Sequence, residues 1–454
     1  MNKKPGIPKG TRDFDSIQLY KRNYIIEIIK ANFLKFGFNP IETPSFERSS
    51  TLLGKYGDEG DRLIFKILKS GDFLKDLDNQ DLVDCNKGKI ASKISDKALR
   101  YDLTVPFARY VVQNQNEITL PFKRFQIQPV WRADRPQRGR FREFFQCDAD
   151  VVGSDSLLQE VELVQLYDEA FSKLGLNVNI RINNRKILAG IAEVAGIADK
   201  LIDFTVALDK LDKIGEEGVL KEMSEKGISD EQLNKVIPII QATGSNLERL
   251  QFLAKYLESS EIGRKGVEEL AFVLDNVYAL GLTKSNCILD ITLARGLNYY
   301  TGAIFEVEVL DVKMGSVGGG GRYDDLTGIF GMKNLSGVGI SFGLDRIYLC
   351  LDELELFPTD EFSGTTVLFA NYGEQEALAS LKVLKELRGN NVASEIYPSN
   401  AKMKKQFDYA SKKGIPFLAM IGSDEMANNL IKLKNLESGE QEELNLESFL
   451  NRFA

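Results

Sequence analysis

The stretch WRADRPQRGRFREFFQCDADVVG, residues 131–153, decides how the chain around it folds. Partial alternation of apolar and polar residues predicts one strand over 123–131 and a second over 144–153. The segment between them contains Pro136 and Gly139, which favour turns. The sequence therefore predicts an extended hairpin whose loop carries Arg132, Arg135, Arg138, Arg140 and Arg142.

This hairpin has two interpretations. Arginine stays charged and presents a planar fork of donors that suits phosphate oxygens. If the segment is extended, Arg140, Arg142 and Phe144 share one face, and the ring can stack on a flat base. A nucleoside triphosphate would fit both features. The alternative is a solvated hairpin with Asp134 and Glu143 as ion-pair partners, which is the usual meaning of a charge run. The stretch alone leaves both open.

The composition narrows the class of protein. The chain has 454 residues, 43% of them hydrophobic and 27% charged, with a net charge of −8. This length predicts roughly two to four domains. No apolar run could cross a bilayer and no secretory pattern opens the chain, so we expect no membrane association and a cytoplasmic location. The cysteines are too dispersed for a zinc or disulfide framework: Cys85, Cys147, Cys287 and Cys350.

The chain contains no histidine. This excludes Ser-His-Asp and Cys-His nucleophile pairs, an imidazole general base and histidine-ligated metals. Any chemistry must use carboxylates, Arg, Lys, Tyr, Gln or a bound divalent ion.

Hydrophobic periodicity predicts the order of the remaining elements. Residues 15–36 form an amphipathic helix that Asp13 or Asp15 caps. Two further strands lie within 288–309 around a turn at Gly296. The glycine-rich segment 315–326 begins as a turn, and residues 337–354 run from a strand into a helix.

Three further segments differ in character. Residues 186–285 are helical by period and rich in Lys and Glu, which predicts a helical insertion. Residues 355–364 are a polar linker. After it, strands alternate with helices over 365–454, which predicts a small α/β domain with a mostly parallel sheet.

Other segments carry side chains suited to ligand binding. LRYDLTVPFARY (99–110) supplies Asp102 and Thr104, although either residue could simply cap a helix. RGLNYYTG (295–302) places an arginine beside two tyrosines, and GGGGRYDDL (318–326) lets backbone approach a ligand closely. Taken singly, the glycines indicate a flexible turn and the tyrosines partly buried core residues.

Together these segments resemble the signature motifs of class II aminoacyl-tRNA synthetases, and within them the histidyl-tRNA synthetase family. PKGTRDF matches the family's opening, and GFNPIETPSFE resembles motif 1, which ends at Pro44. Residues 131–153 resemble motif 2, and GVGISFGLDRI resembles motif 3 with Arg346. LARGLNYYTG and GGGGRYDDL resemble the two segments that mark histidyl enzymes. The resemblance covers nearly the whole chain.

The resemblance implies an α+β catalytic domain, with an antiparallel six-stranded sheet and flanking helices, over 1–185 and 286–354. Residues 186–285 would be its helical insertion and 365–454 an anticodon-binding α/β domain. The implied protein is a homodimer that uses ATP as a substrate, with Mg²⁺, and joins L-histidine to tRNA(His) through a histidyl-adenylate. Such a reaction needs no general base in its first step, because the attacking carboxylate is already ionised.

The resemblance also implies residue roles. Arg132 and Arg295 would hold the α-phosphate and the carboxylate, and Arg295 would be the catalytic cation specific to the family. Arg140 and Arg346 would bind the γ-phosphate, and Phe144 would stack on adenine. The histidine ligands would be Asp102, Thr104, Gln146, Asp150, Arg295, Tyr300 and Tyr323, and the contacts with the tRNA acceptor end Arg135 and Gln137.

Two departures and two alternatives accompany this interpretation. Residues 101–104 read Tyr-Asp-Leu-Thr where bacterial members often have Pro-Glu-Gly-Thr, and Asn298 stands where an acid is usual. One alternative is a non-catalytic paralogue, either the regulatory subunit of ATP phosphoribosyltransferase or a sensor of uncharged tRNA. The other is a prolyl, threonyl or glycyl synthetase, which would lack the two histidyl segments.

Overall fold

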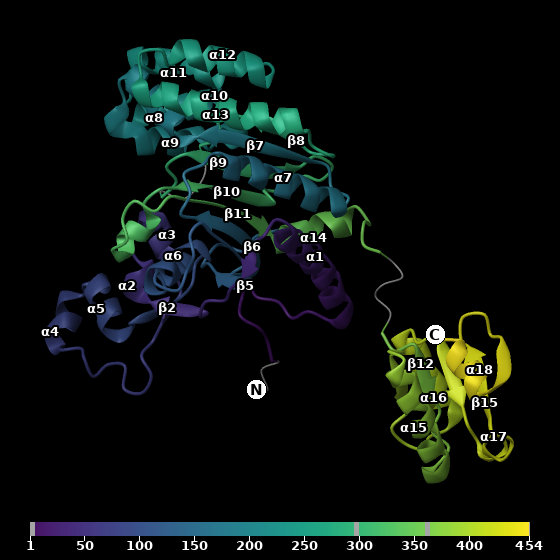
Figure 1. The fold of residues 1–454 in the computed structure, drawn as a ribbon. Helices are drawn as coiled ribbons and strands as arrows, with labels where there is room; N and C mark the ends of the chain where they lie inside the picture. Colours follow the sequence, from purple (N-terminus) through teal and green to yellow (C-terminus); the bar gives the residue numbers. More distant parts are fainter. Residues whose placement is uncertain (1–4, 295–298, 359–363, 454) are drawn as a thin grey trace. The chain divides into compact units, whose positions relative to one another are not determined.

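The computed structural model describes residues 5–294, 299–358 and 364–453, and the chain divides into two compact units, 1–357 and 358–454 (Figure 1). Each unit has its own sheet and its own buried core. Across the described residues, no helix is both long enough and apolar enough to span a bilayer.

An eight-stranded sheet organises the first unit, in the order β1-β5-β6-β11-β10-β9-β7-β8. The six inner strands are antiparallel, as the resemblance predicted, and β1 and β8 add a parallel pairing at each edge. The strands are β1 (Asn39–Pro40), β5 (Phe122–Trp131), β6 (Glu143–Val152), β7 (Val178–Asn184), β8 (Asn286–Leu289), β9 (Ala303–Val309), β10 (Gly318–Tyr323) and β11 (Gly337–Gly343).

Helices α1 (Ser16–Lys35), α7 (Leu158–Lys173) and α14 (Leu344–Glu353) pack together along this sheet (Figure 1). The predicted helix over 15–36 is confirmed: Asp15 accepts from the amide of Gln18, and the Gln18 side chain accepts from the amide of Asp15. The packing is aromatic, with Phe33 5.3 Å from Phe125 and 5.8 Å from Phe342 between ring centroids. These helices hold the sheet in place through their contacts with β6, β7 and β11.

Two smaller parts complete the first unit. A three-stranded sheet, β2-β4-β3, joins the helices of the region before β5. Its elements are β2 (Phe46–Arg48), α2 (Ser49–Leu52), α3 (Gly57–Arg62), β3 (Lys66–Ile67), α4 (Asn79–Asp84), α5 (Lys87–Ile94), β4 (Lys97–Leu99) and α6 (Thr104–Gln113). Between β7 and β8 the chain is helical: α8 (Arg185–Ala195), η1 (Ala198–Lys200), α9 (Leu201–Leu208), α10 (Leu211–Glu225), α11 (Asp230–Ile240), α12 (Asn246–Tyr256) and α13 (Glu261–Leu280).

The segment 315–326 begins with bends at Gly315 and Val317, but its glycine run is not part of a turn, because Gly318–Tyr323 form β10 in the middle of the sheet. A Cβ on Gly320 would overlap with the carbonyl oxygen of Gly339 on β11, and one on Gly321 would lie 2.7 Å from the carbonyl oxygen of Ala303. The glycines therefore serve close strand approach rather than flexibility. The short 3-10 helix η2 (Leu326–Phe330) follows β10.

The two strands predicted within 288–309 exist as β8 and β9, but they are not neighbours, because β7 lies between them. The predicted turn at Gly296 lies outside the described residues. The strand-to-helix run predicted over 337–354 is confirmed as β11 and α14.

The second unit contains a five-stranded sheet in the order β13-β12-β14-β15-β16. The first three strands are parallel, as predicted, whereas β15 and β16 form an antiparallel hairpin that the periodicity did not indicate. Phe369 and Phe449 are fully buried in its core. The elements are β12 (Val367–Phe369), α15 (Glu374–Gly389), β13 (Ser394–Ile396), α16 (Met403–Lys413), β14 (Phe417–Met420), α17 (Ser423–Asn428), β15 (Leu430–Asn435), β16 (Gln441–Asn445) and α18 (Leu446–Asn451).

Candidate active site

Two connected cavities lie over the inner strands of the large sheet. The outer one has a volume of about 360 Å³ and the inner one about 50 Å³. Their shared wall comes from β6, β10, β11 and the segments that flank β5 and β9, and consists of Arg132, Gln146, Tyr300, Gly319, Gly320 and Ser341. A ligand in the outer cavity can thus touch a ligand in the inner one beside Arg132.

The outer cavity brings together four of the predicted nucleotide ligands, Arg132, Arg140, Phe144 and Arg346. Nε of Arg132 donates to the carbonyl oxygen of Tyr101 at 3.0 Å, and its guanidinium lies over the rings of Tyr101 and Phe144, 4.3 and 5.2 Å from the centroids. These contacts fix the direction of Arg132 at the end of β5.

Arg346 joins the hairpin loop to α14. Its Nε donates to the carbonyl oxygen of Gly139 at 2.8 Å and its Nη1 to that of Ser316 at 2.5 Å. The neighbouring Asp345 is buried, accepts from the amide of Phe145 at 3.0 Å and forms ion pairs with Arg12 and Arg22. The N-terminal part of α14 therefore holds the hairpin in place.

The shared face predicted for Arg140, Arg142 and Phe144 is wrong. The loop is not extended, because the backbones of Gln137 and Arg140 bond to each other in both directions at 3.1 and 2.9 Å. Nε of Arg142 donates instead to the carbonyl oxygen of Asp134 at 3.1 Å, and Arg142 does not line either cavity. Arg140 lines the outer cavity with 48% of its side chain exposed, 3.7 Å from Asp134.

The loop tip combines both interpretations of the arginine run. Arg135 and Gln137 are exposed and line neither cavity. Arg138 forms an ion pair with Glu353 at the end of α14, which is the ordinary surface role of a charged residue. Only part of the run is therefore directed into the cavity.

The inner cavity brings together the predicted amino-acid ligands Asp102, Thr104, Gln146, Asp150, Tyr300 and Tyr323. Asp102 accepts from the hydroxyls of Tyr56 at 2.8 Å and Tyr299 at 3.2 Å, and from the amide of Val105 at 3.2 Å. The last contact is the helix-capping role proposed as the alternative, so this carboxylate caps the first turn of α6 and also faces the cavity.

Asp150 is held from two directions. It accepts from the hydroxyl of Tyr323 at 2.7 Å and forms an ion pair of 2.7 Å with Arg124, which lies opposite it on β5. Burial raises the pKa of Asp102 and of Asp150. The donors to each carboxylate oppose this shift, as does the positive charge of Arg132 at Asp102 and of Arg124 at Asp150. Burial, with the charge of Asp150, also raises the pKa of Tyr323, which therefore stays a hydroxyl donor.

Four residues of the inner site were not predicted: Tyr56, Arg124, Asp148 and Tyr299. Asp148 could have been found, because it lies two residues from Gln146 and from Asp150 and so shares their face of β6. Tyr56 comes from α2–α3, far from the motifs in sequence, and no pattern indicated it.

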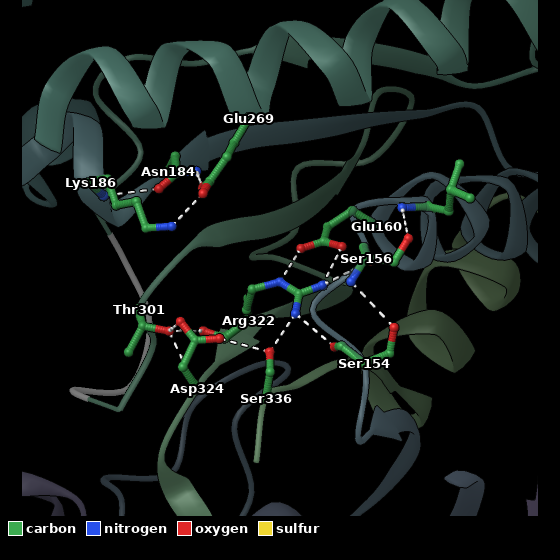
Figure 2. Close-up of polar contacts among 11 residues, drawn as sticks. Ser154, Ser156, Glu160, Asn184, Lys186, Glu269, Thr301, Arg322, Asp324 and Ser336 are labelled. Atoms are coloured by element: carbon green, nitrogen blue, oxygen red, sulfur yellow. Dashed lines mark hydrogen bonds and ion pairs between the residues drawn. The ribbon is translucent and has the colours of Figure 1, made fainter. Parts of the chain in front are cut away.

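A buried network fixes the tyrosines of the inner cavity (Figure 2). Arg322, next to Tyr323 on β10, donates to both carboxylate oxygens of Glu160 on α7 at 2.5 and 2.7 Å and to the hydroxyl of Ser336 at 2.6 Å. Ser336 donates to Asp324 at 2.7 Å, as does the hydroxyl of Thr301 at 2.6 Å. The segments that carry Tyr300 and Tyr323 are thus tied together (Figure 2).

The predicted catalytic cation Arg295 lies outside the described residues. Of the described residues that follow it, Tyr299 lines the inner cavity.

Comparison with known proteins agrees with this geometry. Residues 92–347 match the family model described as histidyl-tRNA synthetase, and residues 367–454 that of the anticodon binding domain. The Histidine--tRNA ligase of Christiangramia forsetii is 64% identical over 98% of both chains, and that of Bacteroides fragilis 58% over 99% of both. The crystal structure of histidyl-tRNA synthetase from Nostoc sp. PCC 7120 is 32% identical, with a TM-score of 0.80 over 99% of both chains. The chain belongs to the histidyl-tRNA synthetase family.

Proposed function

We propose that the two cavities divide the family's reaction between them, with ATP in the outer cavity and L-histidine in the inner one. The reaction ligates L-histidine to tRNA(His) through a histidyl-adenylate and releases diphosphate and AMP. The observation that carries this proposal is the shared wall, where Arg132 faces both cavities.

In the first step the histidine carboxylate attacks the α-phosphorus of ATP, a P–O bond forms, and diphosphate leaves. Negative charge builds on the phosphoryl oxygens, and a fixed cation stabilises it. Arg132 stands where the two substrates would meet, and its contacts with Tyr101 and Phe144 hold it there before the substrates bind. Arg295 is the second cation of this step in our proposal, by its place in the family motif.

Arg140 and Arg346 would bind the γ-phosphate, and Phe144 would stack on adenine. All three line the outer cavity. The chemistry of their side chains fits a triphosphate and a flat base. Arg140 is the more exposed of the two arginines, which suits a group that engages when the nucleotide arrives.

The inner cavity would select histidine. Asp102, Thr104 and Gln146 would receive its amino and carboxylate groups, and Asp150, Tyr300 and Tyr323 would read its ring. The Tyr323–Asp150 pair is buried, so an amino acid that leaves it unsatisfied would bind poorly. In the second step the terminal adenosine of tRNA(His) accepts the histidyl group from the adenylate.

For tRNA, we propose that Arg135 and Gln137 contact the acceptor end, because both are exposed on the loop beside the outer cavity. The unit 365–454 would bind the anticodon, in keeping with its match to the anticodon binding domain. The proposed catalytic domain comprises residues 1–185 and 286–354, the helical insertion residues 186–285, and the anticodon-binding domain residues 365–454.

Mg²⁺ would bind mainly through the ATP phosphates. Among the residues that the structure describes, no three acidic or cysteine side chains gather as metal ligands. Single carboxylates, Asp134 and Glu306, do line the outer cavity. Such a donor set fits an ion held chiefly by phosphate oxygens, with one or two protein oxygens as further ligands. When bound, the ion would neutralise phosphate charge.

We also propose that the protein is a homodimer and that it acts in the cytoplasm. The support is the motif 1 resemblance of residues 37–47, within which Phe46 is half exposed. The non-catalytic paralogue is not favoured, because relatives at 58–64% identity over nearly the whole chain are named ligases. Light scattering on the purified chain would test the dimer.

The test of the nucleotide site uses two arginines of one loop. Arg140→Ala is expected to raise the ATP KM about tenfold or more in pyrophosphate exchange, since a charge-assisted contact contributes roughly 1.5–3 kcal/mol. Arg138→Ala is the matched control, because Arg138 pairs with Glu353 and lines neither cavity. Equal effects of the two substitutions on the ATP KM would contradict the assignment.

A further inference from the structure

Asp148 is a carboxylate of the inner cavity to which no role has been given. It lies on β6 between Gln146 and Asp150, which occupy the same face of that strand. It is 2% exposed and lines the inner cavity together with both of them. Its position therefore makes it a direct neighbour of any ligand bound there.

Among the described residues Asp148 forms no ion pair, unlike Asp150, and has two donors where Asp102 has three. Asp102 accepts from two tyrosine hydroxyls and one amide, and Asp150 from Tyr323 and the guanidinium of Arg124. Among the described residues, Asp148 receives one long bond, 3.5 Å from Nε2 of Gln146, and an interaction with the hydroxyl of Ser341. A buried carboxylate with so few donors is costly unless a ligand supplies more.

The charges around the inner cavity also favour a positively charged ligand group. Three carboxylates, Asp102, Asp148 and Asp150, line the inner cavity, and among the described residues Arg132 is the one guanidinium that lines it with them. Arg124 pairs with Asp150, and Arg100 faces Asp148 from outside the cavity lining. The lining of the cavity is therefore acidic. The α-ammonium is the only group of histidine that is fully cationic at pH 7 to 8, because the imidazole is then mostly neutral.

The same surroundings shift the proton equilibrium of Asp148. Burial, with the nearby charge of Asp150 and Asp102 and against that of Arg124, raises its pKa to about 7. The other titratable groups facing it are Arg100, Tyr167 and Tyr300. Above pH 7 the carboxylate is ionised, and below pH 7 it is mostly protonated.

We propose that Asp148 is a further substrate-binding residue of the histidine site, whose ionised carboxylate accepts a hydrogen bond from the α-ammonium group of the substrate. This inference rests on the proposed placement of histidine in the inner cavity. Binding of the amino acid would therefore weaken as the pH falls from 8 to 6, because Asp148 then takes up a proton.

The test measures binding of L-histidine to the full chain without ATP, by calorimetry at pH 8 and at pH 6, for the wild type and for Asp148→Asn. At pH 8 the Kd of the variant is expected to be about tenfold or more above that of the wild type, the loss of one charge-assisted bond. At pH 6 that ratio should be roughly tenfold smaller, in proportion to the ionised fraction. Titration of the substrate ring affects both proteins equally and leaves the ratio unchanged.

A second measurement needs no variant. An analogue with the α-ammonium and a triazole ring that does not titrate in this range should bind the wild type more weakly at pH 6 than at pH 8. A ratio of the variant and wild-type Kd values that is near one at pH 8, or that does not change between pH 8 and pH 6, would overturn the inference. If the Kd of Asp148→Asn for ATP rose as much as its Kd for histidine, the inference would also be overturned, because the substitution would then have damaged the site as a whole. A wild type that binds no histidine would instead refute the proposed function.

Discussion

At the scale of the residue, Tyr323 shows how the inner cavity combines stability with recognition. Its hydroxyl donates to Asp150 at 2.7 Å, and its neighbour Arg322 anchors the strand to Glu160. Burial keeps the Tyr323 pKa well above its usual value, so the hydroxyl keeps its proton and remains a donor at neutral pH.

Tyr323→Phe is expected to raise the histidine KM about tenfold or more, because it removes a donor to a buried carboxylate at a cost of roughly 1.5–3 kcal/mol. The ATP KM should stay within about twofold. Pyrophosphate exchange at varied histidine and ATP checks both values. Tyr397→Phe, in the core of the second unit, serves as the control and should change neither KM. A rise in the ATP KM alone would refute the role of Tyr323.

Side-chain alternation predicted the cavity-facing residues of β6 well but failed in the hairpin loop. Gln146 and Asp150 face the cavity because β6 is a regular strand. Arg142 does not join Arg140, because the loop folds back on itself between Gln137 and Arg140. Periodicity does not apply within such a turn, and just after it the backbone amide of Arg142 donates to the carbonyl oxygen of the distant Gly10.

At the scale of the element, β10 leaves no room for a Cβ at Gly320 or Gly321 but tolerates one at the preceding Gly319. A Cβ on Gly320 would overlap with backbone of β11, whereas one on Gly319 would lie 3.4 Å from the carbonyl oxygen of Phe305. The sequence showed four glycines in a row, but the neighbouring strands that require them are known only from the fold.

Gly320→Ala is therefore expected to destabilise the protein by about 1–3 kcal/mol or to prevent folding, as overpacking does. Gly319→Ala should unfold at nearly the wild-type temperature. Thermal unfolding followed by circular dichroism compares the two variants. Similar midpoints for both would show that β10 does not need glycine for strand packing.

The Arg322–Glu160 pair joins β10 to α7 where neither side chain reaches water. Glu160→Gln would leave a buried guanidinium without its counter-charge and is expected to cost about 3–5 kcal/mol of unfolding free energy. Glu269→Gln, which breaks the more exposed pair with Lys186 in Figure 2, should cost less. Denaturant titration measures the unfolding free energy of both variants. An equal loss of unfolding free energy in the two would contradict the larger role assigned to the buried Arg322–Glu160 pair.

At the scale of the whole molecule, the two compact units have separate cores, and both cavities belong to the first unit. A chain that ends at residue 357 should therefore retain histidine-dependent pyrophosphate exchange but charge tRNA(His) poorly. Exchange and aminoacylation assays on the same preparation test this. Undiminished charging of tRNA(His) by the shortened chain would show that the second unit is not needed for tRNA binding.

The element order and the parallel part of the second sheet followed from periodicity, because each segment carries its own hydrophobic pattern. The hairpin of β15 and β16 did not, since most of its side chains are polar and partly exposed. The inner cavity also depends on long-range contacts, such as Tyr56 with Asp102, that only the folded chain creates.

The central claim is that the joined cavities activate histidine with ATP. ATP–pyrophosphate exchange by the purified full chain, with each of the twenty amino acids supplied in turn, tests it most directly. Exchange that depends on histidine and on no other amino acid is the predicted result. No exchange with histidine, or faster exchange with another amino acid, would contradict the claim.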